Sequence, residues 1–136
     1  MSIPVVDLSH FTRGDEQQRK AFVDKLGKAY EDVGFVAVVN HGVPQQLIDD
    51  FFDATARFFE QPDEVKQQYE RMELNGQRGY TSFGREKAKH SEVADLKEFW
   101  QIGQVVEGDD PVREEYPENI YSEEIPEFTA KGDELY

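Results

Sequence analysis

Apolar and polar residues in the first forty positions predict a strand, a helix and a second strand in turn. Residues 3–8 form a short apolar segment with Pro4 near its start, where a missing N–H group does least harm to a strand. Over residues 15–33 the apolar positions follow the helical period, and Gly34 stands where a helix is expected to end. Residues 35–39 are apolar throughout, which predicts a strand covered on both faces.

The middle of the chain predicts two more helices and another strand. Pro44 opens a segment whose apolar residues, many of them phenylalanine, recur at helical spacing until Pro62 interrupts it. Residues 63–69 resume as a short helix. Residues 75–79 have the composition of a turn, and residues 96–102 alternate apolar and polar positions as a half-buried strand does.

The C-terminal part is polar and acidic. Residues 80–90 have no regular pattern, and the acidic residues 107–124 predict an extended loop. Pro126 then opens a last helix over residues 127–136. Neither Gly nor Pro follows that helix, so we expect the chain to be cut from a longer protein.

Composition bounds the class of protein. The chain has 136 residues, of which 38% are hydrophobic and 32% charged, so we expect one soluble domain with one hydrophobic core. No apolar run approaches the roughly 18 residues of a membrane span, and no secretory signal is visible at the start. The absence of cysteine excludes disulfides and thiolate metal sites, and the expected location is cytoplasmic.

The net charge of −14 argues against binding to nucleic acid or to an anionic membrane. The charge is uneven, since residues 91–136 carry 14 acidic and 3 basic side chains. A run of this kind is more often a solvated face or a loose tail than an acidic docking surface, and we favour the first interpretation.

A search for catalytic residues finds little. A non-haem iron centre needs two histidines and a carboxylate, and the three histidines here are His10, His41 and His90. Only residues 90–92, His-Ser-Glu, have ligand spacing, and no histidine follows them, so we interpret His90 as an exposed loop residue. There is no nucleophile elbow and no phosphate-binding loop. The residues alone predict an acidic α+β domain without a visible active site.

Five ordered segments nevertheless match one family signature, GF-x-x-VVNHGVP being the most specific of them. They are Ile3–Leu8, Gly34–Pro44, Phe58–Lys66, Arg78–Tyr80 and Asp95–Trp100. With these segments the chain resembles the N-terminal region of isopenicillin-N-synthase-like non-haem Fe(II)/2-oxoglutarate-dependent oxygenases. The resemblance implies an α+β fold, with helices packed on a few short strands, as the N-terminal portion of a jelly-roll (double-stranded β-helix) oxygenase whose catalytic barrel is absent.

The same resemblance implies where the chemistry lies. In this family a His-x-Asp…His triad holds the iron and an Arg-x-Ser pair holds the cosubstrate, all in a later jelly-roll domain. We therefore expect no catalytic residue, metal ligand or cofactor in this chain, and Fe(II) and 2-oxoglutarate in the complete enzyme. Residues 1–120 would be the N-terminal domain, and residues 121–136 the start of a connector helix toward the missing domain.

The resemblance also suggests two substrate-binding residues. Arg78 can pair with a substrate carboxylate, and Tyr80 offers a ring and a hydroxyl group. The alternative is that Arg78 is a solvated loop cation and that Tyr80 caps the core. His41 is interpreted as a turn histidine hydrogen-bonded to the backbone. Trp100 and the aromatic stripe are either core or the surface that meets the missing domain; the stripe is Phe51, Phe52, Phe58 and Phe59.

Three hypotheses about function remain open. In the first, the chain is part of an oxidoreductase that oxidises a small organic molecule, and is inactive by itself. In the second, it is a free-standing binding or scaffold module derived from such an enzyme. The third, a stand-alone metalloenzyme, is disfavoured by the histidine count. If apolar surface stays uncovered, the isolated chain is expected to self-associate.

Overall fold

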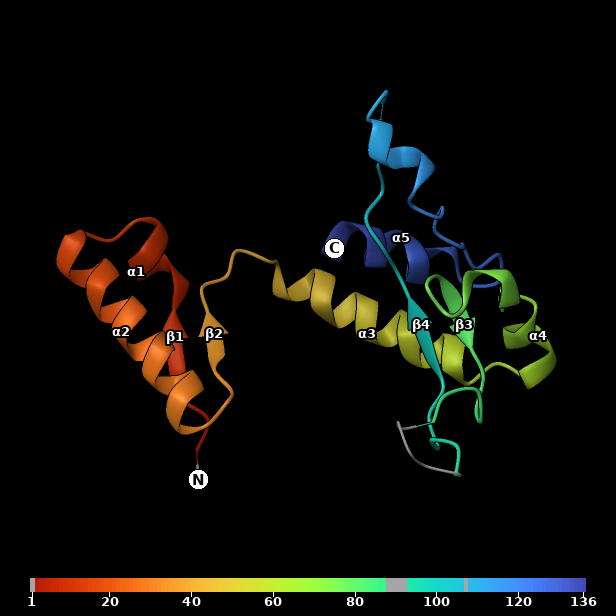
Figure 1. Ribbon diagram of the computed structural model, residues 1–136, viewed down its shortest axis with the longest axis horizontal. Helices are drawn as coiled ribbons and strands as arrows, with labels where there is room; N and C mark the ends of the chain where they lie inside the picture. The colour runs from red at the N-terminus through yellow and green to blue at the C-terminus, as the bar shows by residue number, and fades with distance from the viewer. Residues whose placement is uncertain (1, 88–92, 107) are drawn as a thin grey trace. The chain divides into compact units, whose positions relative to one another are not determined.

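The computed structural model describes residues 2–87, 93–106 and 108–136. The backbone divides into two compact units, residues 1–44 and residues 45–136 (Figure 1). The buried apolar residues follow this division, with Val6, Phe22 and Ala29 in the first unit and an aromatic cluster in the second. Most of the buried apolar side chains among the described residues therefore belong to the second unit. Within the described ranges, no helix is both long and apolar enough to cross a membrane.

The first unit has a strand at each end and two helices between them. In chain order these are β1 (Val5–Asp7), α1 (Leu8–Thr12), α2 (Glu16–Asp32) and β2 (Ala37–Val39). β1 and β2 pair in parallel, with Val6 opposite Val38. Both expected strands are present but shorter than predicted, and α1 was not anticipated.

α2 begins and ends where the sequence predicts. The Asp15 carboxylate accepts the backbone N–H of Gln18 at 2.8 Å, and the Gln18 side chain accepts the backbone N–H of Asp15 at 3.0 Å. This reciprocal pair satisfies two N–H groups that a helix start otherwise leaves unbonded. Gly34 follows the helix with a φ of +83° and donates its N–H to the carbonyl of Ala29 at 3.1 Å. Glycine is favoured at this position because it lacks a Cβ atom.

β2 is exposed, contrary to the expectation of a strand covered on both faces. Phe35, Val38 and Val39 are 69%, 39% and 42% exposed. The sheet of this unit has two strands, and α2 packs against β1. The first unit therefore leaves part of the apolar side chains of residues 35–39 exposed.

In its described residues, the second unit contains three α-helices and a two-stranded sheet. These are α3 (Gln45–Phe59), α4 (Asp63–Gln67), β3 (Gly79–Thr81), β4 (Phe99–Gln101) and α5 (Pro126–Leu135), with 3₁₀ turns at Met72–Leu74 and Pro111–Glu114. β3 and β4 are antiparallel, with Tyr80 opposite Trp100. The expected helices and the strand near residue 100 are confirmed, whereas β3 lies partly in a segment that was predicted to be irregular.

Phe58 occupies the centre of the second unit. Its ring is fully buried, stacks on Phe128 with centroids 4.9 Å apart, and meets Trp100 edge-on at 4.8 Å. The ring centroid of Tyr80 lies 6.2 Å from that of Phe58. Phe52, on the same helix, is 68% exposed. The aromatic stripe of α3 thus divides between core and surface.

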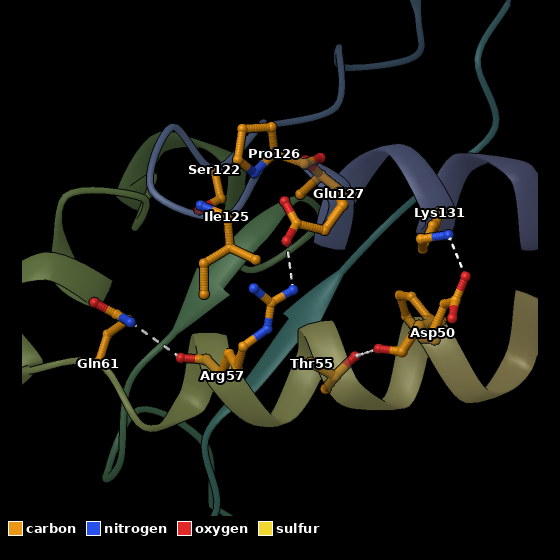
Figure 2. A network of polar contacts seen from close by, with 11 residues as sticks. Asp50, Thr55, Arg57, Gln61, Ser122, Ile125, Pro126, Glu127 and Lys131 are labelled. Atoms are coloured by element: carbon orange, nitrogen blue, oxygen red, sulfur yellow. Dashed lines mark hydrogen bonds and ion pairs between the residues drawn. The ribbon is translucent and has the colours of Figure 1, made fainter.

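Two ion pairs join α3 to α5 (Figure 2). The Lys131 ammonium group lies 2.8 Å from the Asp50 carboxylate, and Arg57 pairs with Glu127. The hydrogen bond from Lys131 lowers the pKa of Asp50, and the hydrogen bond from Arg57 lowers the pKa of Glu127. α5 is therefore held along α3 by charge as well as by its aromatic contacts.

Candidate functional site

β3 can form only because its first residue is glycine. Gly79 has a φ of +74°, and a Cβ atom there would lie 2.6 Å from the carbonyl oxygen of Tyr69. This close approach lets Tyr80 donate its backbone N–H to the same carbonyl at 3.2 Å. The side chain of Tyr80 is then directed into the core, where it is 2% exposed.

The Tyr80 hydroxyl belongs to a buried polar cluster. It donates a hydrogen bond to Glu98 Oε2, which also accepts from Lys66 Nζ at 2.8 Å. Lys66 is 4% exposed, and its ammonium group lies 5.8 Å from the centre of the Tyr80 ring. Burial, followed by the hydrogen bond to Glu98, raises the pKa of Tyr80 well above its usual range. The hydroxyl is therefore a protonated donor that is already engaged by protein.

Arg78 is also buried, being 9% exposed, and so is not a solvated loop cation. Its Nη1 donates to the carbonyl of Gln77 at 2.7 Å, while its Nε is buried without a hydrogen-bond partner. The guanidinium lies against Gly103, where a Cβ atom would stand 2.0 Å from Cζ. Among the described residues Arg78 forms no ion pair, so its charge is not neutralised there.

A cavity of about 270 Å³ opens beside β3. Its walls are Glu70, Arg71, Met72, Asn75, Gly76, Tyr80, Thr81, Arg85 and Glu86. Of the two predicted substrate-binding residues, Tyr80 reaches this cavity and Arg78 does not. Thr81 and Arg71 were not anticipated; the only sequence signal for Thr81 is that it follows the Gly-Tyr element.

The acidic residues of this cavity are already paired. Glu70 accepts from the Ser82 hydroxyl at 3.1 Å and from Arg85 Nε at 3.2 Å. Glu86 pairs with Lys97 at 2.8 Å. Arg71 donates through Nη1 to two backbone carbonyls, those of Gln68 at 2.7 Å and Glu70 at 3.2 Å.

A second hollow of about 300 Å³ is mostly apolar. It is lined by Phe51, Thr55, Phe59, Glu98, Phe99, Trp100, Ile102 and Phe128. The Trp100 Nε1 is buried without a hydrogen-bond partner.

Residues 3–124 match a protein family described as the N-terminal region of the non-haem dioxygenase in morphine synthesis. The chain belongs to this family. The dioxygenase N-terminal domain is 36% identical to the 2-oxoglutarate-dependent dioxygenase frbA of a Dothideomycetidae species, over 76% of the domain and 34% of that protein. It is 34% identical to the proline hydroxylase buaE of Petromyces alliaceus, over 100% of the domain and 43% of that protein.

A solved structure agrees with this assignment. A 2OG-Fe(II) oxygenase family protein from Caulobacter crescentus superposes with a TM-score of 0.79 at 32% identity, over 99% of the dioxygenase N-terminal domain and 43% of that chain. The predicted mixture of helices and short strands is thereby confirmed, and it is similar to the N-terminal part of a 2OG-Fe(II) oxygenase. The domain spans less than half the length of these relatives.

The described residues of the dioxygenase N-terminal domain do not fit an iron centre. No group of three or more His, Asp or Glu side chains converges anywhere in the part that the structure describes. His41 Nδ1 accepts the backbone N–H of Val43 at 3.2 Å, which confirms its interpretation as a turn residue. His10 lies 3.9 Å from Asp7 alone. Residues 90–92, the one sequence match to ligand spacing, are outside the described residues.

Proposed function

We propose that this domain is the N-terminal, substrate-pocket-supporting part of an oxidoreductase that uses Fe(II), O2 and 2-oxoglutarate to oxidise a small organic molecule. The observation that carries the proposal is the family match over residues 3–124, in a chain that spans 43% of the oxygenases with which it aligns fully. The iron and cosubstrate sites would lie in a C-terminal jelly-roll domain, and this chain alone would be inactive.

The cavity beside β3 is the proposed contribution of this domain to the substrate pocket. It combines the Thr81 hydroxyl, the Met72 side chain and two arginines among its walls, which is the mixture of apolar body and few polar groups that small-molecule sites use. Tyr80, whose side chain is directed into the core, would support this wall from within the domain. Arg78, buried and without an ion pair among the residues that the structure describes, would meet a carboxylate of the substrate or of the adjoining domain.

The apolar groove beside Trp100 is the proposed contact with the jelly-roll domain. Its Phe, Trp and Ile side chains are buried or half-buried in this domain, and the apolar hollow between them would receive side chains of the jelly-roll domain. In the isolated chain the same groove would support self-association. A net charge of −14 disfavours nucleic acid and anionic membranes as partners. A cytoplasmic location belongs to the same proposal, and fractionation of native cells with an antibody to this domain tests it.

The deciding experiment is the intact mass of the protein purified from its native source. A mass somewhat more than twice 15.7 kDa is expected, since the chain spans 43% of relatives such as the proline hydroxylase. That full-length protein should then form succinate from 2-oxoglutarate only when Fe(II) is supplied. A native mass of 15.7 kDa would instead favour the free-standing module.

A further inference from the structure

Among the described residues that wall it, the cavity beside β3 has one cation without an ion pair. Its two carboxylates, Glu70 and Glu86, already have cationic partners in Arg85 and Lys97. Arg71 makes no ion pair in the part of the chain that the structure describes, and it uses a single nitrogen to bond backbone carbonyls. Those bonds fix the guanidinium in place while leaving its other donors for a ligand. A guanidinium binds planar carboxylates through two parallel hydrogen bonds.

A buried hydroxyl group in the same wall also lacks a partner. Thr81 is 6% exposed, and its Oγ1 makes no hydrogen bond. This oxygen faces Gly76, another wall residue, at 3.4 Å from the position that a Cβ atom would take there. A buried hydroxyl without a partner destabilises a fold, so such groups call for an explanation. After a rotation of the Thr81 side chain that turns this oxygen toward the cavity, a ligand there would supply the missing hydrogen bond.

The size and charge of the cavity limit the kinds of ligand that it can bind. Small-molecule sites usually enclose roughly 300–1,000 Å³, so a volume of about 270 Å³ fits a small molecule or one end of a larger one. One free cation balances one negative charge. A phosphate, with a charge of about −2, would be left partly unbalanced beside Glu70 and Glu86 in a protein of net charge −14. A monocarboxylate carries a single negative charge, which the one cation balances.

We infer that this cavity binds the carboxylate end of a small organic acid that carries a second polar group, with Arg71 holding the carboxylate and Thr81 the polar group. As a binding site it stands on these contacts alone. Its assignment to the substrate of the enzyme rests on the proposed function.

Nuclear magnetic resonance titration of the ¹⁵N-labelled chain tests the inference with three matched probes: lactate, propionate and lactamide. Lactate has the carboxylate and a hydroxyl, propionate lacks the hydroxyl, and lactamide lacks the charge. Lactate should shift the amide signals of Gly76 and Thr81 in a saturable way. Propionate should bind more weakly, and lactamide should not saturate. No saturable shift at these amides with either acid, or equal binding of lactamide and lactate, would overturn the inference.

Variants separate binding from folding. Arg71→Met should weaken lactate binding about tenfold, as loss of a charged hydrogen bond does, and Arg71→Lys, which keeps the charge, should weaken it less. Arg19→Met, on the exposed face of α2, is the matched control and should change nothing. Thr81→Val should remove the preference for lactate over propionate while leaving propionate binding intact. Equal weakening by Arg71→Met and Arg19→Met would refute the site.

Two further results keep this inference apart from the proposed function. If the full-length protein forms succinate from 2-oxoglutarate but the titration fails, only the carboxylate site is refuted. If 2-oxoglutarate itself binds these amides more tightly than lactate does, the assignment to the substrate is overturned.

Discussion

Lys66 and Glu98 lie 32 residues apart in sequence and form an ion pair of 2.8 Å in which both side chains are largely buried. Asp63 is a second, exposed partner of Lys66 at 3.2 Å. Because Tyr80 donates to the same Glu98 oxygen, the pair also fixes the side chain of Tyr80, a residue that lines the cavity. The ion pair thereby connects α4, which carries Lys66, to the β3–β4 sheet.

Breaking this ion pair should be strongly destabilising. We expect Lys66→Met to lower the free energy of unfolding by about 3 kcal/mol, because a buried carboxylate is left without its cation. Urea denaturation measures the change. The double variant Lys66→Met/Glu98→Gln should recover much of the loss, since the amide carries no charge and still accepts from Tyr80.

The exposed pair of Lys20 and Asp24 is the matched control. It has a similar separation of 2.7 Å, but its side chains are 75% and 64% exposed. Lys20→Met should therefore change the free energy of unfolding by little more than the error of measurement. Equal losses for Lys66→Met and Lys20→Met would contradict the role assigned to the buried pair.

The raised pKa of Tyr80 predicts that the domain loses stability at alkaline pH. Burial and the hydrogen bond to Glu98 raise its pKa above the ordinary value of 10.0. Its contribution is complete below that value and is lost as the pH rises further, because the unfolded chain then releases its proton while the folded chain does not. Lys66 acts in the same direction. Burial alone would lower its pKa, but the hydrogen bonds to Glu98 and Asp63 outweigh burial and raise it.

Tyr80→Phe tests this dependence directly. At neutral pH the variant should be less stable by about 1 kcal/mol, the usual value of one hydrogen bond. The deficit should shrink between about pH 10 and pH 11, where wild type loses the contribution of the tyrosine. Denaturation curves at several pH values measure it. A deficit that stays constant across this range would contradict the pKa shift of Tyr80.

The sequence predicts those elements whose signals are local. α2 could be predicted because Asp15 and Gly34 mark its two ends, and α5 because Pro126 marks its start. β3 could not, since three residues give no usable period and its pairing with β4 depends on residues about twenty positions away. Burial of β2 was wrongly predicted because apolar composition cannot say whether the covering surface belongs to the same unit.

The candidate site divides in the same way. Tyr80 could be singled out because it lies in a recognisable Gly-Tyr element. Arg71 and Thr81 could not, because their importance depends on what their neighbours do. Arg71 matters because Glu86 is paired with Lys97, eleven residues away, and so does not neutralise the cavity. That pairing cannot be predicted from the spacing of these residues in the sequence.

The attachment of α5 to α3 should weaken as the pH becomes acidic. The pKa values of Asp50 and Glu127 are lowered by Lys131 and Arg57, so their contribution is present above the ordinary values of 3.8 and 4.5 and is lost as the pH falls below them. Asp50→Asn/Glu127→Gln should speed hydrogen exchange of the α5 amides at neutral pH. The difference between wild type and variant should shrink as the pH falls below 3.8 and through the lowered pKa values of the two carboxyl groups.

The control for this measurement is Asp49→Asn. Asp49 is exposed on the same helix and accepts from Gln45 within α3, not from α5. Its replacement should leave the exchange of α5 unchanged. Faster exchange of α5 in Asp49→Asn, or none in the double variant, would show that the two ion pairs do not hold α5.

Glycine substitutions should separate two effects at the start of β3. Gly79→Ala should destabilise by about 3 kcal/mol, because its φ of +74° strains an L-residue and its Cβ would approach the Tyr69 carbonyl to 2.6 Å. Gly84 has a similar φ of +79° but open space, with the nearest atom 3.9 Å away. Gly84→Ala should therefore cost about 1 kcal/mol, for the backbone conformation alone.

A third glycine substitution should increase the stability of the domain. Gly27 lies inside α2 with nothing within 4 Å of a Cβ position, so Gly27→Ala should stabilise by about 0.8 kcal/mol through helix propensity. Urea denaturation of all three variants measures the order. If Gly79→Ala cost no more than Gly84→Ala, the contact with the Tyr69 carbonyl would not be what requires glycine there. The placement of Tyr80 beside the cavity would then need another cause.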